Sequence, residues 1–231
     1  SAGLKEAMYY YGRMLFNGEG IPINKTEGNR YYKMAAELGC IDAIKQYASN
    51  LIEGDEIEKN LEEATQLYRK GAQLNDLDCI FQYGSHLDKG IGIQTNRTEA
   101  KDYYKMAADK GHVKAMYIYA YFMENGYGTE INYKEASKYY KMAADNHDLE
   151  AMNIYARMLE EGRGVDKNWS EAGKYYKRAS DQGHLSATYK YACMLEKGTG
   201  VSKNIEQAKH YYKIAADKGH KEAKERYDYL N

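Results

Sequence analysis

The sequence has little of what marks several large classes of protein. Only three of its 231 residues are cysteines, and Cys40, Cys79 and Cys193 fall at unrelated places with no CxxC motif. This pattern argues against a disulfide framework and against a cysteine-based zinc site, so we expect free thiols in a reducing compartment and no bound metal. The single proline, Pro22, lies in an expected loop and interrupts no helix.

Long apolar runs, an excess of one charge and catalytic motifs are missing as well. No apolar stretch approaches the roughly 20 residues that span a membrane, so we expect no direct membrane insertion. The 33 Lys and Arg residues nearly balance the 34 Asp and Glu residues, which argues against a nucleic acid as partner. The sequence contains no GxSxG, HExxH or phosphate-loop motif, so we expect no catalytic residues and no cofactor.

What the chain does contain is one phrase repeated at a fixed spacing. The stretch YYKMAADKGH, residues 103–112, has five further copies, one of which is strongly divergent. The second tyrosine of the phrase, or its equivalent, recurs every 36 residues, at Tyr32, Tyr68, Tyr104, Tyr140, Tyr176 and Tyr212. Self-similarity at such a period predicts a solenoid, in which each unit buries its apolar face against its neighbours. We therefore predict one domain over residues 1–231.

Two amphipathic patterns lie within each repeat. The first, which we call helix A, places apolar residues on one helical face at Ala115, Met116, Tyr119, Ala120 and Met123. The second, helix B, does so at Ala136, Tyr139, Tyr140, Ala143 and Ala144. Six such pairs and a charged last helix from Lys221, suited to capping the stack, make about thirteen helices. The first helix has no comparable polar face, so we expect the natural protein to continue N-terminally.

Turn residues support this division. An asparagine precedes each helix B, and Glu or Gln follows three residues later, a pattern typical of an N-cap whose third residue reaches back to the cap's N–H. The asparagines are Asn24, Asn60, Asn96, Asn132, Asn168 and Asn204. Glycine follows most helices B, at the position that favours a left-handed backbone. We expect an altered turn at Asn146 and His147, and a differently bent loop where Glu56 replaces a glycine.

The stretch EAMNIYARMLEEGRGVDKNWSEAGKYYKRASDQGHLSA, residues 150–187, resembles the Sel-one-like repeat (SLR), a relative of the tetratricopeptide repeat. The match covers essentially the whole chain. The resemblance implies a right-handed α-solenoid superhelix of antiparallel helix pairs whose concave side binds proteins or peptides. It also implies an adaptor or scaffold of signalling or protein quality control. Some bacterial members are secreted and stapled by cysteine pairs within a repeat, and the absence of such pairs places this chain nearer the cytosolic members.

If helix A lines the concave side, its non-core positions should carry specificity, because they differ from repeat to repeat. Aromatic and arginine side chains that packing does not require are typical interface anchors. We predict a groove centred on Phe81, Tyr117, Tyr121 and Arg157 that binds an extended peptide or a helix of acidic and apolar character. The predicted partner-binding residues are Tyr9, Arg13, Lys45, Phe81, Tyr117, Tyr121, Asn153, Arg157 and Tyr189, with Phe16, Ser49, Ser85 and Cys193 at equivalent or adjacent places.

Other interpretations stay open. The chain can be a structural spacer between other domains of a longer protein, or, more remotely, a hydrolase, and we expect a monomer. His112, His184 and His220 recur after the turn, but a repeat or more separates them, so we interpret them as turn residues that pack on the next helix rather than as metal ligands. Three sequons, at Asn24, Asn96 and Asn168, keep the lumen of the endoplasmic reticulum possible beside the cytoplasm.

Overall fold

The computed structural model describes residues 2–54 and 56–231, and every regular element within them is an α-helix. The thirteen helices of these residues are α1 (Ala2–Asn17), α2 (Lys25–Glu37), α3 (Ile41–Glu53), α4 (Leu61–Gln73), α5 (Leu77–Lys89), α6 (Arg97–Asp109), α7 (Val113–Asn125), α8 (Tyr133–Asp145), α9 (Leu149–Glu161), α10 (Trp169–Asp181), α11 (Leu185–Lys197), α12 (Ile205–Asp217) and α13 (Lys221–Leu230). Odd-numbered helices up to α11 are the predicted helices A, and even-numbered ones are the helices B. The predicted all-α architecture of repeated helix pairs is confirmed.

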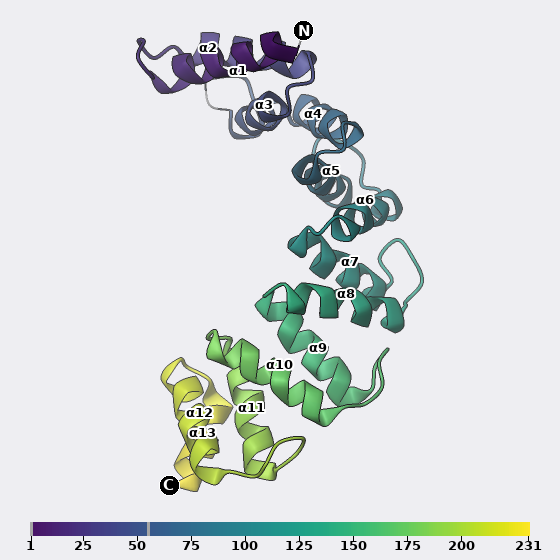
Figure 1. The fold of residues 1–231 in the computed structure, drawn as a ribbon, viewed down its shortest axis with the longest axis vertical. Helices are drawn as coiled ribbons and strands as arrows, with labels where there is room; N and C mark the ends of the chain where they lie inside the picture. The colour runs from purple at the N-terminus through teal and green to yellow at the C-terminus, as the bar shows by residue number, and fades with distance from the viewer. Residues whose placement is uncertain (1, 55) are drawn as a thin grey trace. The chain divides into compact units, whose positions relative to one another are not determined.

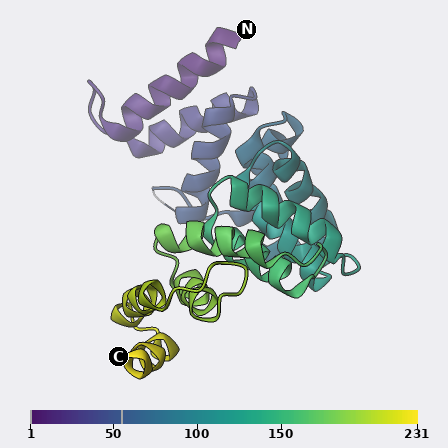
Figure 2. The same ribbon diagram turned by 60° about the horizontal axis from the view of Figure 1, so that its bottom comes forward.

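The helices are grouped in two compact units, which we call unit 1 (Ser1–His112) and unit 2 (Val113–Asn231). Unit 1 contains α1 to α6, and unit 2 contains α7 to α13. Within each unit, successive helices pack against one another, and each helix A turns back into its helix B as a hairpin (Figures 1 and 2). The prediction of one domain over residues 1–231 stays a prediction.

Alanine and tyrosine side chains fill the core of each unit. On α8, Ala136, Tyr140 and Ala143 are fully buried. Tyr119 of α7 meets Tyr139 of α8 edge-on, with ring centroids 4.6 Å apart and an interplanar angle of 75°. Such an aromatic pair adds about 0.5–1.5 kcal/mol beyond the area it buries. The same contact recurs as Tyr11–Tyr31, Tyr83–Tyr103, Tyr155–Tyr175 and Tyr191–Tyr211.

The asparagine before each helix B caps that helix as predicted. The side chain of Asn132, for example, accepts a hydrogen bond of 3.0 Å from the backbone N–H of Glu135. The prediction that the glutamate side chain accepts a reciprocal bond from the cap's N–H is wrong. The N–H of Asn132 donates instead to the carbonyl oxygen of Met123, 2.8 Å away on α7. The last carbonyls of a helix lack partners within it, so helix A supplies a ready acceptor. All six caps bond in this way, to Leu15, Leu51, Leu87, Met123, Leu159 and Leu195.

The turn after helix B keeps one backbone conformation whatever residue occupies it. Asn75 and His147 have φ values of 67° and 68°, and the glycines at this place have φ between 78° and 96°. The N–H of Asp148 bonds to the carbonyl oxygen of Ala143 at 3.0 Å, which closes the turn. The prediction of an altered turn around Asn146 and His147 is therefore wrong. His147 adopts the left-handed backbone of the equivalent glycines, because the packing of the neighbouring helices requires it.

The loop inside the second repeat also keeps the bend of its equivalents. Glu56 has φ 54°, and the equivalent glycine Gly164 has φ 73°, so the expected change of bend is wrong at this residue. The difference lies in packing. A Cβ added at Gly164 would collide with the backbone carbonyl of Tyr133, whereas Glu56 is exposed. The preceding residue, Asp55, lies outside the described residues.

Candidate functional site

The predicted binding residues occupy two rows on the helices A. The first row is Tyr9, Lys45, Phe81, Tyr117, Asn153 and Tyr189, and the second is Arg13, Ser49, Ser85, Tyr121, Arg157 and Cys193. Members up to Ser85 belong to unit 1, and those from Tyr117 onward belong to unit 2. The predicted centre, Phe81 with Tyr117, Tyr121 and Arg157, thus draws on both units, and each unit is described by itself.

The aromatic members of the first row pack on the buried tyrosine of helix B in their own repeat. Ring centroids lie 5.8 Å apart for Tyr9 and Tyr32, and 5.7 Å apart for Tyr117 and Tyr140. Two further pairs, Phe81–Tyr104 and Tyr189–Tyr212, have centroids 5.8 Å apart. The premise that packing does not require these aromatic residues is therefore wrong in part: one face of each half-buried ring closes the core.

Burial changes the acidity of these tyrosines. It raises the pKa of Tyr117, with further contributions from Glu150 and Asp148. It also raises the pKa of Tyr189 to about 12, together with the neighbouring Cys193. Both hydroxyls are therefore neutral at physiological pH, and they can act as hydrogen-bond donors toward a partner.

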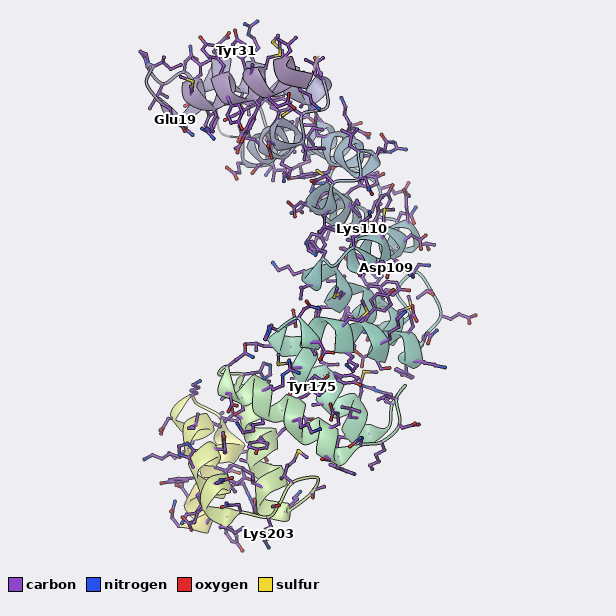
Figure 3. The ribbon with its side chains drawn as sticks, in the orientation of Figure 1. Glu19, Tyr31, Asp109, Lys110, Tyr175 and Lys203 are labelled. Atoms are coloured by element: carbon purple, nitrogen blue, oxygen red, sulfur yellow. The ribbon has the colours of Figure 1, made fainter. Side chains whose placement is uncertain are left out.

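The charged members of unit 1 are tied to acidic neighbours. Lys45 forms an ion pair of 3.1 Å with Asp78 of α5. Arg13 donates a hydrogen bond of 3.3 Å to Glu19, which lies in the loop after α1 (Figure 3). Both pairs are partly exposed to solvent, so their net contribution to stability is small. They leave little unsatisfied charge in this part of unit 1.

In unit 2 the second row carries the more exposed side chains. Tyr121 is 40 % exposed, and its ring centroid lies 5.6 Å from that of Tyr127. The guanidinium of Arg157 is 3.7 Å from the carboxylate of Glu124 on the preceding helix A. Asn153 is half-buried, and no side-chain hydrogen bond of Asn153 is found among the described residues. The structure thus brings Arg157 toward α7, where Tyr117 and Tyr121 also lie.

A row of carboxylates in unit 2 is the part of this surface that sequence reasoning missed. Glu124, Glu160 and Glu196 each accept a hydrogen bond from the buried tyrosine of helix B in their own repeat. The donors are Tyr140 at 2.8 Å, Tyr176 at 3.0 Å and Tyr212 at 2.6 Å. The signal was present, because the three glutamates recur at the 36-residue spacing. Burial and the adjacent carboxylate both raise the pKa of each of these tyrosines.

Arginine completes two of these three sites. Arg163 donates a hydrogen bond of 2.8 Å to the second carboxylate oxygen of Glu124. Arg226 of α13 does the same for Glu196. Both carboxylates are well covered, with side-chain exposures of 12 % and 13 %. Within the part of the chain that the structure describes, no ion pair forms with Glu160.

Three hollows differ in what lines them. One of about 480 Å³ is lined by the cap Asn132 and by Lys141, which pairs with Asp145 at 2.6 Å. Another, of about 390 Å³, is lined by Asn60 and Glu63, and Glu63 pairs with Lys33. The third, of about 220 Å³, lies in unit 2 among α9, α10 and α11, and its lining includes Glu160, Trp169, Tyr189 and Cys193. We call this third hollow the Trp169 pocket, and it alone of the three contains predicted row residues.

The histidines lie at turns, as interpreted from the sequence, but the expectation that they pack on the next helix is wrong, because the rings of His112 and His220 lie on the preceding helix A. His112 stacks on Phe81 with ring centroids 4.3 Å apart, and His220 stacks on Tyr189 at 4.4 Å. His184 and His220 also cap α11 and α13 through Nδ1, a role that sequence reasoning missed. Over residues 2–54 and 56–231, His, Cys, Asp and Glu side chains form no group of three that could hold a metal ion.

None of the described helices combines the length and the apolar character that crossing a membrane requires.

Hairpins of helices that repeat every 36 residues and vary on one helix face define an α-helical repeat protein. The family model of the Sel1 repeat matches residues 5–40, 41–76, 77–112, 113–148, 149–184 and 185–220. The chain therefore belongs to the Sel1 repeat family. Sel1 repeat proteins are generally protein–protein interaction scaffolds, and scaffolds of this kind are typically non-catalytic.

Solved structures share this fold. A protective antigen of uropathogenic Escherichia coli strains, described as displaying an SLR fold, superposes with a TM-score of 0.91 at 24 % sequence identity over 99 % of this chain. A Sel1 repeat protein from Oxalobacter formigenes gives a TM-score of 0.69 at 28 % identity, over 91 % of this chain and 84 % of its own. This chain spans only 49 % of the E. coli antigen. A comparison with curated proteins gives no match.

Proposed function

We propose that the chain is an interaction scaffold whose helix A face in unit 2 binds a peptide segment of another protein. One observation carries the proposal. The helix B side keeps nearly the same residues from repeat to repeat, whereas the helix A side of unit 2 varies and carries exposed or half-exposed aromatic and charged side chains, among them Tyr121, Arg157 and Tyr189. Aromatic and arginine side chains in such a setting are typical interface anchors.

The partner segment is an extended peptide or a helix with acidic and apolar character. Tyr117 and Tyr121 offer apolar ring area together with hydroxyl donors, and Arg157 offers a guanidinium on a side chain that is 45 % exposed. Carboxylates on the partner would accept hydrogen bonds from both kinds of donor. We place the protein among adaptors of signalling or protein quality control, in the cytoplasm.

Partner capture by a double variant tests this proposal. A photo-crosslinking residue at position 121 would identify the partner, and binding of the purified partner would then be measured for wild type and for Tyr117→Ala with Arg157→Ala. We expect the double variant to bind at least tenfold more weakly, because hot-spot truncations cost roughly 2 kcal/mol or more. Lys174→Ala is the matched control, since Lys174 is an exposed residue of α10 that pairs with Glu171 on the same helix.

Folding must be controlled, because Tyr117 packs on Tyr140 and Arg157 pairs with Glu124. Circular dichroism and the thermal midpoint would be recorded for each variant. Equal binding by a folded double variant would contradict the helix A assignment. A spacer gives a different pattern: helix A substitutions then leave the activity of the longer protein intact, and deletion of one whole repeat abolishes it.

A further inference from the structure

The Glu124 site contains an arginine bound in a specific way. The guanidinium carbon of Arg163 lies 5.1 Å from the ring centroid of Tyr133, and a guanidinium nitrogen lies 2.8 Å from Glu124. The other oxygen of Glu124 accepts from Tyr140. A planar guanidinium suits this setting, because it stacks on an aromatic face while it donates to a carboxylate in its own plane.

The next repeat keeps the carboxylate and the aromatic ring of this site but lacks the arginine, and Lys197 replaces Glu161, which pairs with Arg163 at 3.5 Å. Thirty-six residues further on, Glu160 replaces Glu124, Trp169 replaces Tyr133, and Thr199 replaces Arg163. The backbone is unchanged, since the N–H of Thr199 bonds to Met194 at 3.1 Å just as that of Arg163 bonds to Met158 at 2.9 Å. Where the arginine side chain would lie, the Trp169 pocket of about 220 Å³ opens.

The carboxylate of Glu160 is only half satisfied. One oxygen accepts from Tyr176 at 3.0 Å, and in the described residues no donor reaches the other oxygen. Arg157, on the same helix, turns toward Glu124 instead. Lys190 holds the place that Arg226 holds at Glu196, but it lines the pocket without an ion pair to Glu160.

We propose that the Trp169 pocket binds an arginine side chain of the partner peptide, with the guanidinium on Trp169 and hydrogen-bonded to Glu160. This inference rests on the proposed function and specifies its partner. The chain itself supplies the template for the occupant, because one repeat earlier the guanidinium of Arg163 lies between Glu124 and Tyr133. Trp169 already attracts a cation, the ammonium of Lys167 at 4.9 Å from its ring.

The bound arginine has an acidic neighbour in the partner. Lys190 and Lys197 line the pocket beside Glu160, so a lone cation would meet net positive charge there. An adjacent Asp or Glu on the partner would pair with these lysines while the arginine pairs with Glu160. An arginine next to an acidic residue therefore fits the pocket better than either residue alone, and it agrees with an acidic partner segment.

The pocket has its own reporter, because Trp169 is the single tryptophan of the chain. The probe is the dipeptide acetyl-Arg-Glu-amide, titrated to tens of millimolar while the indole N–H resonance and the tryptophan fluorescence are followed. We expect saturable binding of roughly millimolar affinity, and at least tenfold weaker binding of the citrulline analogue, which lacks the positive charge. An absent response, or equal responses to both dipeptides, overturns the inference.

Two variants locate the site. Thr199→Arg should fill the pocket as Arg163 fills its own and should reduce dipeptide binding at least tenfold. Ser202→Arg, which adds the same charge at an exposed place in the same loop, should leave binding unchanged. Glu160→Gln should weaken binding at least tenfold while the thermal midpoint stays near that of wild type. Dipeptide binding that survives Thr199→Arg and Glu160→Gln places the arginine elsewhere and overturns the inference.

The same variants separate this inference from the proposed function. If partner capture depends on Tyr117 and Arg157 but survives Thr199→Arg, the scaffold proposal stands and the arginine pocket fails. If the dipeptide binds as described but capture ignores every helix A substitution, the pocket stands as an arginine site and the scaffold proposal fails.

Discussion

Unit 1 and unit 2 have cores of the same kind, but they differ in what the buried tyrosine of helix B meets on helix A. In unit 2 the hydroxyls of Tyr140, Tyr176 and Tyr212 donate to glutamates. In unit 1 two of the equivalent helix A positions hold apolar residues, Phe16 and Ile52, and the third holds Asp88, which together with burial raises the pKa of Tyr104. The ring of Tyr32 lies against Phe16, with centroids 5.8 Å apart, and burial raises the pKa of Tyr32 to about 12.

This difference teaches that one repeated core can support two kinds of surface. The tyrosine ring fills the same space in both units, so the helix pairs stack alike. The helix A residue that faces its hydroxyl then decides whether the adjacent surface is apolar or acidic. In unit 2 an arginine pairs with Glu124 and another pairs with Glu196, whereas the Trp169 pocket lies beside Glu160.

The largest expected effect contrasts a tight loop of unit 2 with an open loop of unit 1. Gly164→Ala places a methyl group against the carbonyl oxygen of Tyr133, whereas Gly20→Ala meets nothing within 4 Å. Both residues have positive φ, 73° and 77°, so both variants carry conformational strain of about 1 kcal/mol. We expect Gly164→Ala to lower the free energy of unfolding by about 3 kcal/mol or more, because its collision is with backbone.

Urea unfolding followed by circular dichroism measures both losses, and tryptophan fluorescence reports unit 2 separately. Equal losses for the two glycine variants would mean that the loops of unit 2 do not press on the preceding helix B as the structure has them.

A smaller effect is expected where the hydroxyl itself is removed. Tyr140→Phe deletes a hydrogen bond to a carboxylate and should cost about 1.5 kcal/mol. Tyr32→Phe should cost less than about 0.5 kcal/mol, because no hydrogen bond of the Tyr32 hydroxyl is found in the described part of the chain. Chemical denaturation of the two variants checks the contrast, and a larger loss for Tyr32→Phe would reverse the comparison between the units.

Most of the fold could be predicted from the sequence, because a solenoid needs the same packing residues in every repeat. The spacing of Tyr104 and Tyr140, the capping asparagines and the turn glycines each mark one structural requirement. The wrong predictions concern residues whose hydrogen bond or backbone conformation is set by a neighbouring helix rather than by the local sequence. The N–H of Asn132 found a carbonyl on helix A rather than a glutamate, and His147 adopted a backbone that glycine usually provides.

Less of the candidate site could be predicted. Variation between repeats identified the helix A rows, but it does not indicate which side chains pair across repeats. Arg163 and Glu124 are 39 residues apart and meet only because one loop returns beside the preceding helix A. The Trp169 pocket beside Glu160 is recognised only when the Arg163–Glu124 pair is compared with Thr199 and Glu160 in the next repeat.

The smallest expected effect separates the units by pH. In unit 1, burial and then Lys89 lower the pKa of His86, whose Nδ1 lies 2.6 Å from Thr65 and whose ring packs edge-on against Tyr68. In the unfolded chain His86 takes up a proton below about pH 6.5, whereas in the folded chain it stays neutral to a lower pH. The folded state of unit 1 therefore loses stability as the pH falls below 6.5.

In unit 2 the carboxyl group of Glu196 behaves differently. Burial acts to raise its pKa, but hydrogen bonds from Tyr212 and Arg226 outweigh burial and lower it below 4.5. Its contribution is therefore present above 4.5 and is lost only below that value. Between these two limits, far-ultraviolet circular dichroism in mild urea should report weakening of unit 1 while the fluorescence of Trp169 holds steady. His86→Gln, which cannot titrate, should remove the early loss, and a variant that keeps it would assign the transition to another group.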